Sequence, residues 1–466
     1  MQPVVAWAHV FAERYDLPAP LGYFVAGSAA AVALSFVVAA VFLRRTPREL
    51  PAKSFTVSLG PLHQPLRIVC QVLSVLVLCM VVLAGLLGTR NPEMNFAPVF
   101  VWIVWWVGLP LVVACVGNIW STLDPWRALY EWTDRAARRL GFADGISLNL
   151  AYPPWLGAWP AVFLLLLFVW IEVIYPHAAV PSHTANLVLA WSAFTLAGML
   201  CFGLDAWRRN VDVFAIYFTT LGRFAPIDLR PDGRGIELRP PGHGLITAQA
   251  GSFALVGFVI AMLATVLFDG LLSTQALATI HRTLAESLPG VVDEQGYILG
   301  TVGLICVWLL FFGAYLVSCL ATARLVRDRP AASIACTFAL TLVPIAIAYN
   351  IAHYFSYLLV QGQMIIPLLS DPLGRNWNLF GTATYYPDIG LFDARFTWYL
   401  AISSIVTGHV ISIWLAHRLA LREFRAPGQA VIASIPLIVL MMTYTAISLL
   451  VIADPLVQVA QPAVPS

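Results

Sequence analysis

The fold of this chain is decided by residues 67–88, RIVCQVLSVLVLCMVVLAGLLG. The stretch opens with one arginine and contains no acidic residue. An α-helix of roughly 20 apolar residues crosses the hydrocarbon core of a bilayer, which is about 30 Å thick. Residues 67–88 therefore predict a transmembrane helix.

Nine other apolar runs of similar length occur along the chain. Of its 466 residues, 60% are hydrophobic and 11% are charged, whereas a soluble domain has about 25% charged residues. We therefore expect an all-α polytopic membrane helix bundle in the lipid bilayer, with residues 1–466 as one integral membrane domain. The ten expected spans are about 20–43, 67–88, 97–118, 155–175, 186–206, 248–268, 298–321, 333–360, 396–417 and 429–452.

Lys and Arg are distributed unevenly between the loops. If the N-terminus lies outside, 21 of the 26 Lys and Arg residues face the inner side of the membrane. Cytoplasmic loops carry such an excess, so we expect both termini on the extracytoplasmic side. The acidic residues divide evenly, which leaves the outer side net negative and attractive to cations.

Two inner segments, 120–139 and 210–225, interleave aromatic residues with arginine. Each begins near an aspartate that can cap a helix, Asp124 or Asp212. Both segments are expected to be amphipathic helices lying in the cytoplasmic interface.

The eighth span contains the most polar groups. Pro344 is expected to kink it and to free backbone groups. Beyond the proline, polar side chains recur at spacings of three and four residues and therefore share one helix face. They are Asn350, His353, Tyr357 and Gln361, followed by Gln363.

Ionisable residues inside a membrane are costly and often functional. Glu172 in the fourth span and Asp269 at the end of the sixth are expected at a similar depth near the outer side. With the loop acids Asp371 and Asp388, they could form an outward-facing polar cavity around His353. The alternative is a stripe that only packs helices together.

His353 and His409 are the two histidines inside spans that could bind a metal or a haem. Their expected depths differ by roughly 9 Å, at 1.5 Å of rise per residue, which argues against shared ligation unless the kink lowers His353. A divalent metal held by His353, His409, Glu172 and Asp269 stays an open alternative. No HExxH, HxH, GxSxG or Walker motif occurs, and no basic stripe suits nucleic acid.

Several segments resemble a bacterial family of multi-span membrane proteins labelled fenitrothion hydrolase. They are HVFAERYDLPAPL (9–21), GNIW (117–120), DPWRALY (124–130), LGRFAP (221–226), IAHYFSYLLVQGQMIIPLLSDPLG (351–374), WNLFGTA (377–383) and WYLAISSIVTGHVISIWLAH (398–417). The resemblance covers almost the whole chain. It implies a multi-pass protein of the bacterial inner membrane that hydrolyses an organophosphorus triester.

For that chemistry, the candidate catalytic residues are His353, Asn350, Asp371 and Asp388, with Tyr357, Gln361 and Gln363 lining a pocket for a small apolar substrate. Triester hydrolysis needs an activated water and stabilisation of developing charge. Three other functions stay open: a transporter or permease for a cation or small solute, a haem- or copper-binding subunit, and a structural partner in a larger membrane complex.

Overall fold

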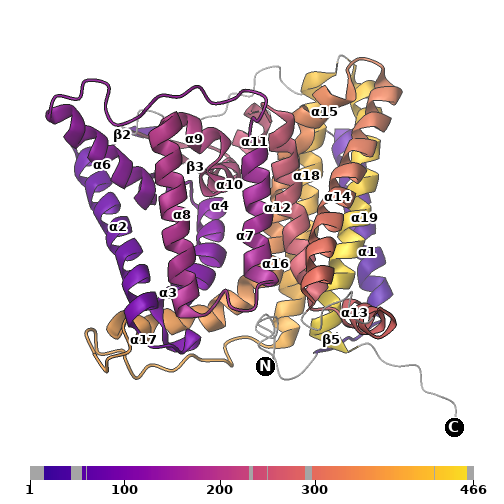
Figure 1. The fold of residues 1–466 in the computed structure, drawn as a ribbon. Helices are drawn as coiled ribbons and strands as arrows, with labels where there is room; N and C mark the ends of the chain where they lie inside the picture. The colour runs from indigo at the N-terminus through magenta and orange to yellow at the C-terminus, as the bar shows by residue number, and fades with distance from the viewer. Residues whose placement is uncertain are drawn as a thin grey trace, which may run out of the picture.

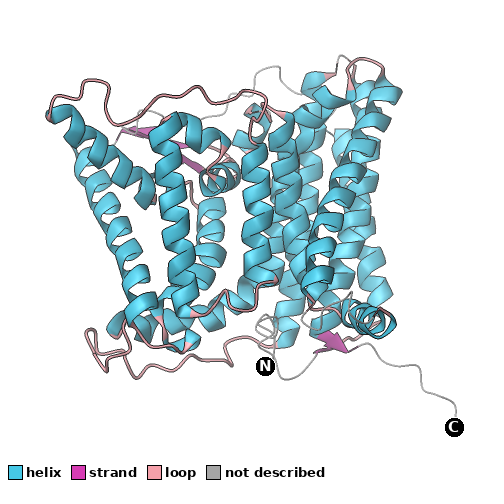
Figure 2. Cartoon of the chain, viewed as in Figure 1, coloured by secondary structure: helices cyan, strands magenta, loops and turns pink. Residues whose placement is uncertain are grey.

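The computed structural model describes residues 15–42, 55–58, 60–229, 235–248, 250–288, 296–424 and 426–458. Figure 2 shows helices throughout these ranges, and short strands only at the two ends of the helices. The expectation of an all-α polytopic helix bundle is confirmed. Some of the basic loop residues that predicted the orientation, including Lys53, lie outside the described residues.

Nine helical runs among the described residues are long and apolar enough to cross a bilayer, and they coincide with nine of the ten predicted spans. Two of these runs change helix type along their length. The runs are α1 (Leu21–Phe42); α2 (His63–Leu87); α3 (Phe96–Pro98) with η4 (Val99–Gly108) and α4 (Leu109–Cys115); α8 (Pro181–Phe202); α12 (Phe253–Leu272); α14 (Tyr297–Val326); α15 (Ala331–Phe338) with η5 (Ala339–Leu342) and α16 (Val343–Gln361), then η6 (Gly362–Met364) and α17 (Ile365–Ser370); α18 (Ala394–Glu423); and α19 (Pro427–Leu456).

The predicted fourth span is shorter than the others. It is α7 (Trp159–Val173), a helix of 15 residues, which rises only about 22 Å. Strands β1 (Tyr15–Asp16) and β5 (Val457–Gln458) pair in parallel, so the first and last helices have their free ends on the same side. An even number of helices must then run between the two sides, and α7 supplies the tenth.

The remaining elements lie at the ends of the long helices. They are η2 (Gly60–Leu62), η3 (Pro92–Met94), α5 (Trp120–Leu123), α6 (Pro125–Arg139), α9 (Leu204–Asn210), α10 (Val213–Gly222), α11 (His243–Thr247) and α13 (Gln275–Ser287), with a three-stranded sheet in the order β2 (Phe55–Ser58), β4 (Gly235–Leu238), β3 (Ile227–Leu229). In Figure 1, β2, α9, α11 and α15 lie at the upper end of the bundle, and α13, α17 and β5 lie at the lower end. We name the lower end, which holds β1 and β5, the outer end, and the upper end the inner end, following the distribution of Lys and Arg.

The prediction of an interfacial helix is wrong for segment 210–225. Both predicted caps form, since the carboxylates of Asp124 and Asp212 accept backbone N–H groups of α6 and α10. However, every residue of α10 except Thr219 is buried. The segment VFAIYFTTLG is apolar on all sides, and such a helix belongs in a core rather than at an interface. Helix α6 does lie at the inner end, packed against α2 and α8.

Candidate functional site

The eighth span is broken where the proline predicts a kink. Helix α15 ends at Phe338, the 3₁₀ turn η5 follows, and Pro344 lies in the first turn of α16. Proline lacks the amide proton that would continue the helical hydrogen bonds. The nearby carbonyl of Thr341 is bound by the hydroxyl of Ser412 on α18, at 2.5 Å. A side chain of the neighbouring helix thus satisfies a backbone group at the break.

Two turns beyond the break, α16 contacts an acid. The Nε2 atom of His353 lies 3.0 Å from Oδ2 of Asp269 on α12, and the hydroxyl of Tyr354 donates to the same oxygen at 2.5 Å. The side chain of His353 is 5% exposed and that of Asp269 is 16% exposed. A single carboxylate therefore binds an imidazole and a phenol inside the bundle.

A second carboxylate lies close by. Glu172 on α7 lies beside Trp106 and within electrostatic range of Asp269. Tyr217 on the buried helix α10 lies beside Asn350 and within range of Glu172. The predicted residues Glu172, Asp269, Asn350 and His353 thus gather on one side of α16.

Trp106 belongs to an unusual element. Residues 99–108 form the π-helix η4, a helix type that is rare and often found at functional sites. Its Trp102 donates to the carbonyl of Ala178 at 3.1 Å, and Trp106 packs edge-on against Phe168 of α7, with ring centroids 4.4 Å apart. The π-helix therefore fixes the wall of the site beside Glu172.

A series of polar side chains continues from His353 towards the middle of the bundle. The ring centroids of His353 and Tyr349 lie 6.1 Å apart, and those of His409 and Tyr444 lie 5.7 Å apart. Tyr349 lies within electrostatic range of Tyr444, which joins the two pairs. We name Asp269, His353, Tyr349, Tyr444 and His409 the polar column.

Buried polar atoms without a hydrogen-bond partner lie along this column. Among the described residues, they include the hydroxyl of Tyr349, Nε2 of His409 and Oγ of Ser448, which lies beside Tyr444. Leaving such a group unpaired costs about 1–3 kcal/mol. The column therefore contains polar atoms that the described side chains do not pair.

The described residues do not support the metal or haem alternatives. They contain no group of three His, Cys, Asp or Glu side chains placed to hold a metal ion. His353 is bound to Asp269, while Nδ1 of His409 lies 2.8 Å from the carbonyl oxygen of Ile405 in its own helix. Tyr349 lies beside His353, and Tyr444 lies beside His409, so each imidazole has a phenol ring as its neighbour.

The outer loop residues have a different role from the one predicted. The carboxylate of Asp371 accepts the backbone N–H groups of Arg375 and Asn376, and that of Asp388 accepts the N–H of Gly390. Gln363 binds backbone groups at Leu359 and Asp388 and accepts the hydroxyl of Tyr385. These contacts shape the loop, and none of those described joins it to His353. Tyr357 and Gln361 are half-buried on α16.

Sequence reasoning missed Tyr349, Tyr354, Tyr217 and Tyr444. Tyrosine is common at membrane interfaces, so a tyrosine inside a span gives a weak signal. The spacing of Tyr349 and His353, four residues on one helix, was the available clue.

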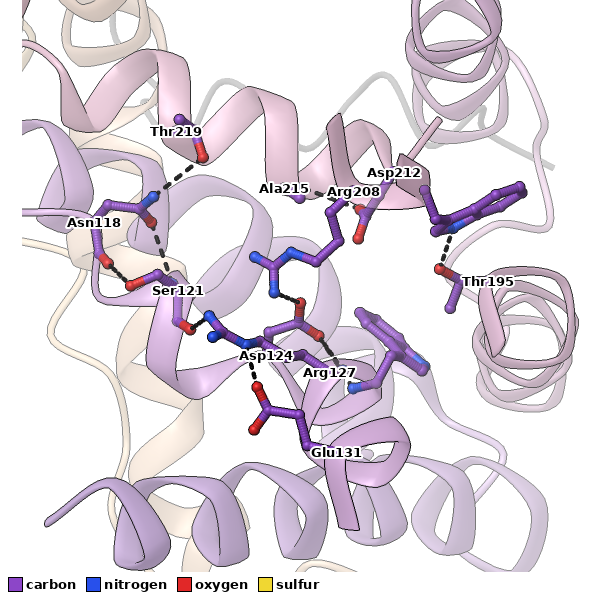
Figure 3. Close-up of polar contacts among 12 residues, drawn as sticks. Asn118, Ser121, Asp124, Arg127, Glu131, Thr195, Arg208, Asp212, Ala215 and Thr219 are labelled. Carbon is purple, nitrogen blue, oxygen red and sulfur yellow. Dashed lines mark hydrogen bonds and ion pairs between the residues drawn. The ribbon is translucent and has the colours of Figure 1, made fainter. Parts of the chain in front are cut away.

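The inner end carries a second group of buried charges, shown in Figure 3. Arg208 lies 3.1 Å from Asp124, whose side chain is fully buried. Burial and the charge of Asp124 raise the pKa of Asp212 from 3.8 to about 7. Burial also raises the pKa of Asp124, against the opposing effect of Arg208. Arg208 thus opposes the rise in pKa of both acids where α6, α9 and α10 meet, and Arg127 also does so for Asp124.

A large apolar cavity lies on the other side of η4 and α16. Its volume is about 1160 Å³, and its walls come from α2, η4, α4, α7, α8 and α10, with Phe355 and Leu358 of α16. We name it the furrow.

No known family model, curated protein sequence or solved structure matches this chain. The assignment of function therefore depends on the site itself.

Proposed function

We propose that the protein is a cation transporter whose cation is the proton, and that protons pass through the polar column. The contact of His353 with Asp269, inside a span, carries this proposal. Ionisable residues within membrane spans characterise ion pathways and proton relays. Imidazole and carboxylate both bind and release protons, and the phenols of Tyr349 and Tyr444 extend the series.

The direction of the column also favours transport. Asp269 lies near the outer end of α12, and His409 lies near the middle of α18. His417 follows on the same helix, eight residues or about 12 Å nearer the inner end. The excess of Lys and Arg at the inner end fits the inner membrane of a bacterium, which we propose as the location.

Proton flux into proteoliposomes tests the proposal. The full chain is reconstituted with a pH-sensitive dye inside, and a valinomycin-imposed potassium potential, negative inside, drives protons inward. We expect the wild type to acidify the lumen faster than protein-free vesicles do and Asp269→Asn to remove the difference. Asp388→Asn is the matched control, because Asp388 is an exposed outer-loop acid, and its flux should equal that of the wild type. Wild-type flux at the protein-free level would refute the proposal, as would full flux in Asp269→Asn.

Hydrolysis of an apolar aryl phosphorothioate triester is the second candidate. Asp269 can orient His353, whose imidazole then removes a proton from water. The resulting hydroxide attacks phosphorus, the bond from phosphorus to the aryl oxygen breaks, and the phenolate leaves. The furrow offers an apolar route beside α16 for a substrate dissolved in the bilayer.

Release of the nitrophenol from fenitrothion measures this activity directly. General-base catalysis contributes about 10²–10⁴-fold in rate, so His353→Gln should lower the rate at least about 100-fold, and His281→Gln, on the outer helix α13, should not. Equal rates for the wild type and His353→Gln would eliminate hydrolysis at this site without affecting the proton proposal.

A further inference from the structure

The furrow has the size and lining of a binding site for long apolar chains. It reaches from Trp120 near the inner end to Ile365 near the outer end, and its lining is almost wholly apolar. Its volume of about 1160 Å³ exceeds the 300–1,000 Å³ typical of small-molecule pockets. A molecule that fills it must extend across much of the membrane.

Two large aromatic side chains, Trp120 and Trp191, form part of the apolar lining of the furrow. Among the described residues, the indole Nε1 atoms of Trp120 and Trp191 are buried and unpartnered, and both side chains line the furrow. Trp120 is 4% exposed. Both Nε1 atoms are shielded by protein, so the furrow meets the apolar indole rings and not their N–H groups.

Three arginines surround one carboxylate beside that end of the furrow. Arg67, Arg127 and Arg135 lie 2.5, 2.8 and 3.8 Å from the carboxylate of Glu131, and their side chains are 32%, 30% and 50% exposed. Arg127 also donates to the carbonyl of Ser121 at 2.7 Å, next to Trp120, as Figure 3 shows for Ser121, Arg127 and Glu131. One glutamate leaves this group net positive and accessible to an anion.

We propose that the furrow binds an anionic phospholipid of the inner leaflet. Its acyl chains occupy the furrow, and its phosphate lies on Arg67, Arg127 and Arg135. Basic pockets between helices on the cytoplasmic side bind anionic headgroups in this way. The arginine group lies beside the inner end of the furrow, as a headgroup lies at the end of its acyl chains. The proposal is independent of proton transport.

Lipid binding to the detergent-solubilised full chain, followed by native mass spectrometry, tests this site. The probes are dioleoyl phosphatidylglycerol and dioleoyl phosphatidylcholine. We expect the wild type to prefer phosphatidylglycerol by about tenfold or more, and Arg67→Gln with Arg135→Gln to remove that preference. Arg139→Gln, on the same helix but outside the Glu131 group, is the matched control.

Equal binding of the two lipids by the wild type would overturn the proposal. The proposal is also overturned if Arg139→Gln weakens the binding of phosphatidylglycerol as much as the double variant does. Displacement of the bound lipid by neutral ubiquinone would overturn it as well. If the double variant fails to fold, Arg135→Gln alone makes the same comparison, because Arg135 is half-exposed and its ion pair with Glu131 is the longest of the three.

Discussion

At the scale of single residues, Tyr354 is the group that holds Asp269 beside His353. Its hydroxyl donates to Asp269 at 2.5 Å, and a hydrogen bond to a charged group contributes about 1.5–3 kcal/mol. We expect Tyr354→Phe to lower the free energy of unfolding by that amount, measured by titration with denaturing detergent. Tyr385→Phe, which removes an exposed hydrogen bond to Gln363, should cost less than about 1 kcal/mol. Equal losses for the two variants would contradict this role of Tyr354.

Asp212 makes the stability of the inner end depend on pH. Because its pKa is raised to about 7, the folded state keeps a proton that the unfolded chain releases above pH 3.8. Its stabilising contribution is therefore full below pH 3.8 and is lost as the pH rises through 7. The thermal midpoint in detergent should fall between pH 5.5 and 8.5, and Asp212→Asn should flatten this fall while keeping the helix cap. Parallel pH curves for the two proteins would exclude Asp212 as the cause.

The residues of the site were only partly predictable. Sequence placed Asp269 and His353 at similar depths because each ionisable group interrupts an apolar run, and the structure brings them into contact. Tyr444 could not be connected to His409 in advance, because neighbour relations between α18 and α19 depend on helix rotation and packing. Asp371 and Asp388 were expected at the site, yet a carboxylate in a loop can equally bind the backbone of that loop, as both do.

At the scale of helices, Gly408 allows α18 to approach the break in α16. A Cβ atom at position 408 would lie 2.7 Å from the carbonyl oxygen of Pro344 and would clash with Ala348. We expect Gly408→Ala to destabilise the protein by about 1–3 kcal/mol through overpacking. Gly313→Ala on α14 is the control, because a Cβ there meets nothing within 4 Å, and it should stabilise by about 0.4–1 kcal/mol. If Gly408→Ala and Gly313→Ala shift the thermal midpoint in the same direction, the close contact at Gly408 is contradicted.

The apolar runs predicted where helices form. They did not predict the helix type, or whether a helix lies in the core or at the interface. The π-helix η4 forms within a run whose composition equally suits an α-helix. Segment 210–225 was assigned to the interface because of its arginines, but every residue of α10 except Thr219 is buried. Periodicity identifies an apolar face only where a polar face exists to contrast with it.

For the molecule as a whole, the long helices run between a Lys- and Arg-rich inner end and an outer end that carries β1 and β5 (Figure 1). The polar column starts near the outer end, and the arginine group beside the furrow lies at the inner end. A proton entering at Asp269 would therefore move with an inside-negative potential towards His409. Proton transport along the column therefore requires both Asp269 at its outer end and His409 at its inner end.

Proton flux through the wild type, Asp269→Asn and His409→Leu, reconstituted side by side, tests the polar column most directly. His409 is 1% exposed and bonds the backbone of its own helix, so proper assembly is first checked by size-exclusion elution. We expect wild-type flux above that of protein-free vesicles and its loss in both variants. Undiminished flux in both variants, or none in the wild type, would contradict it.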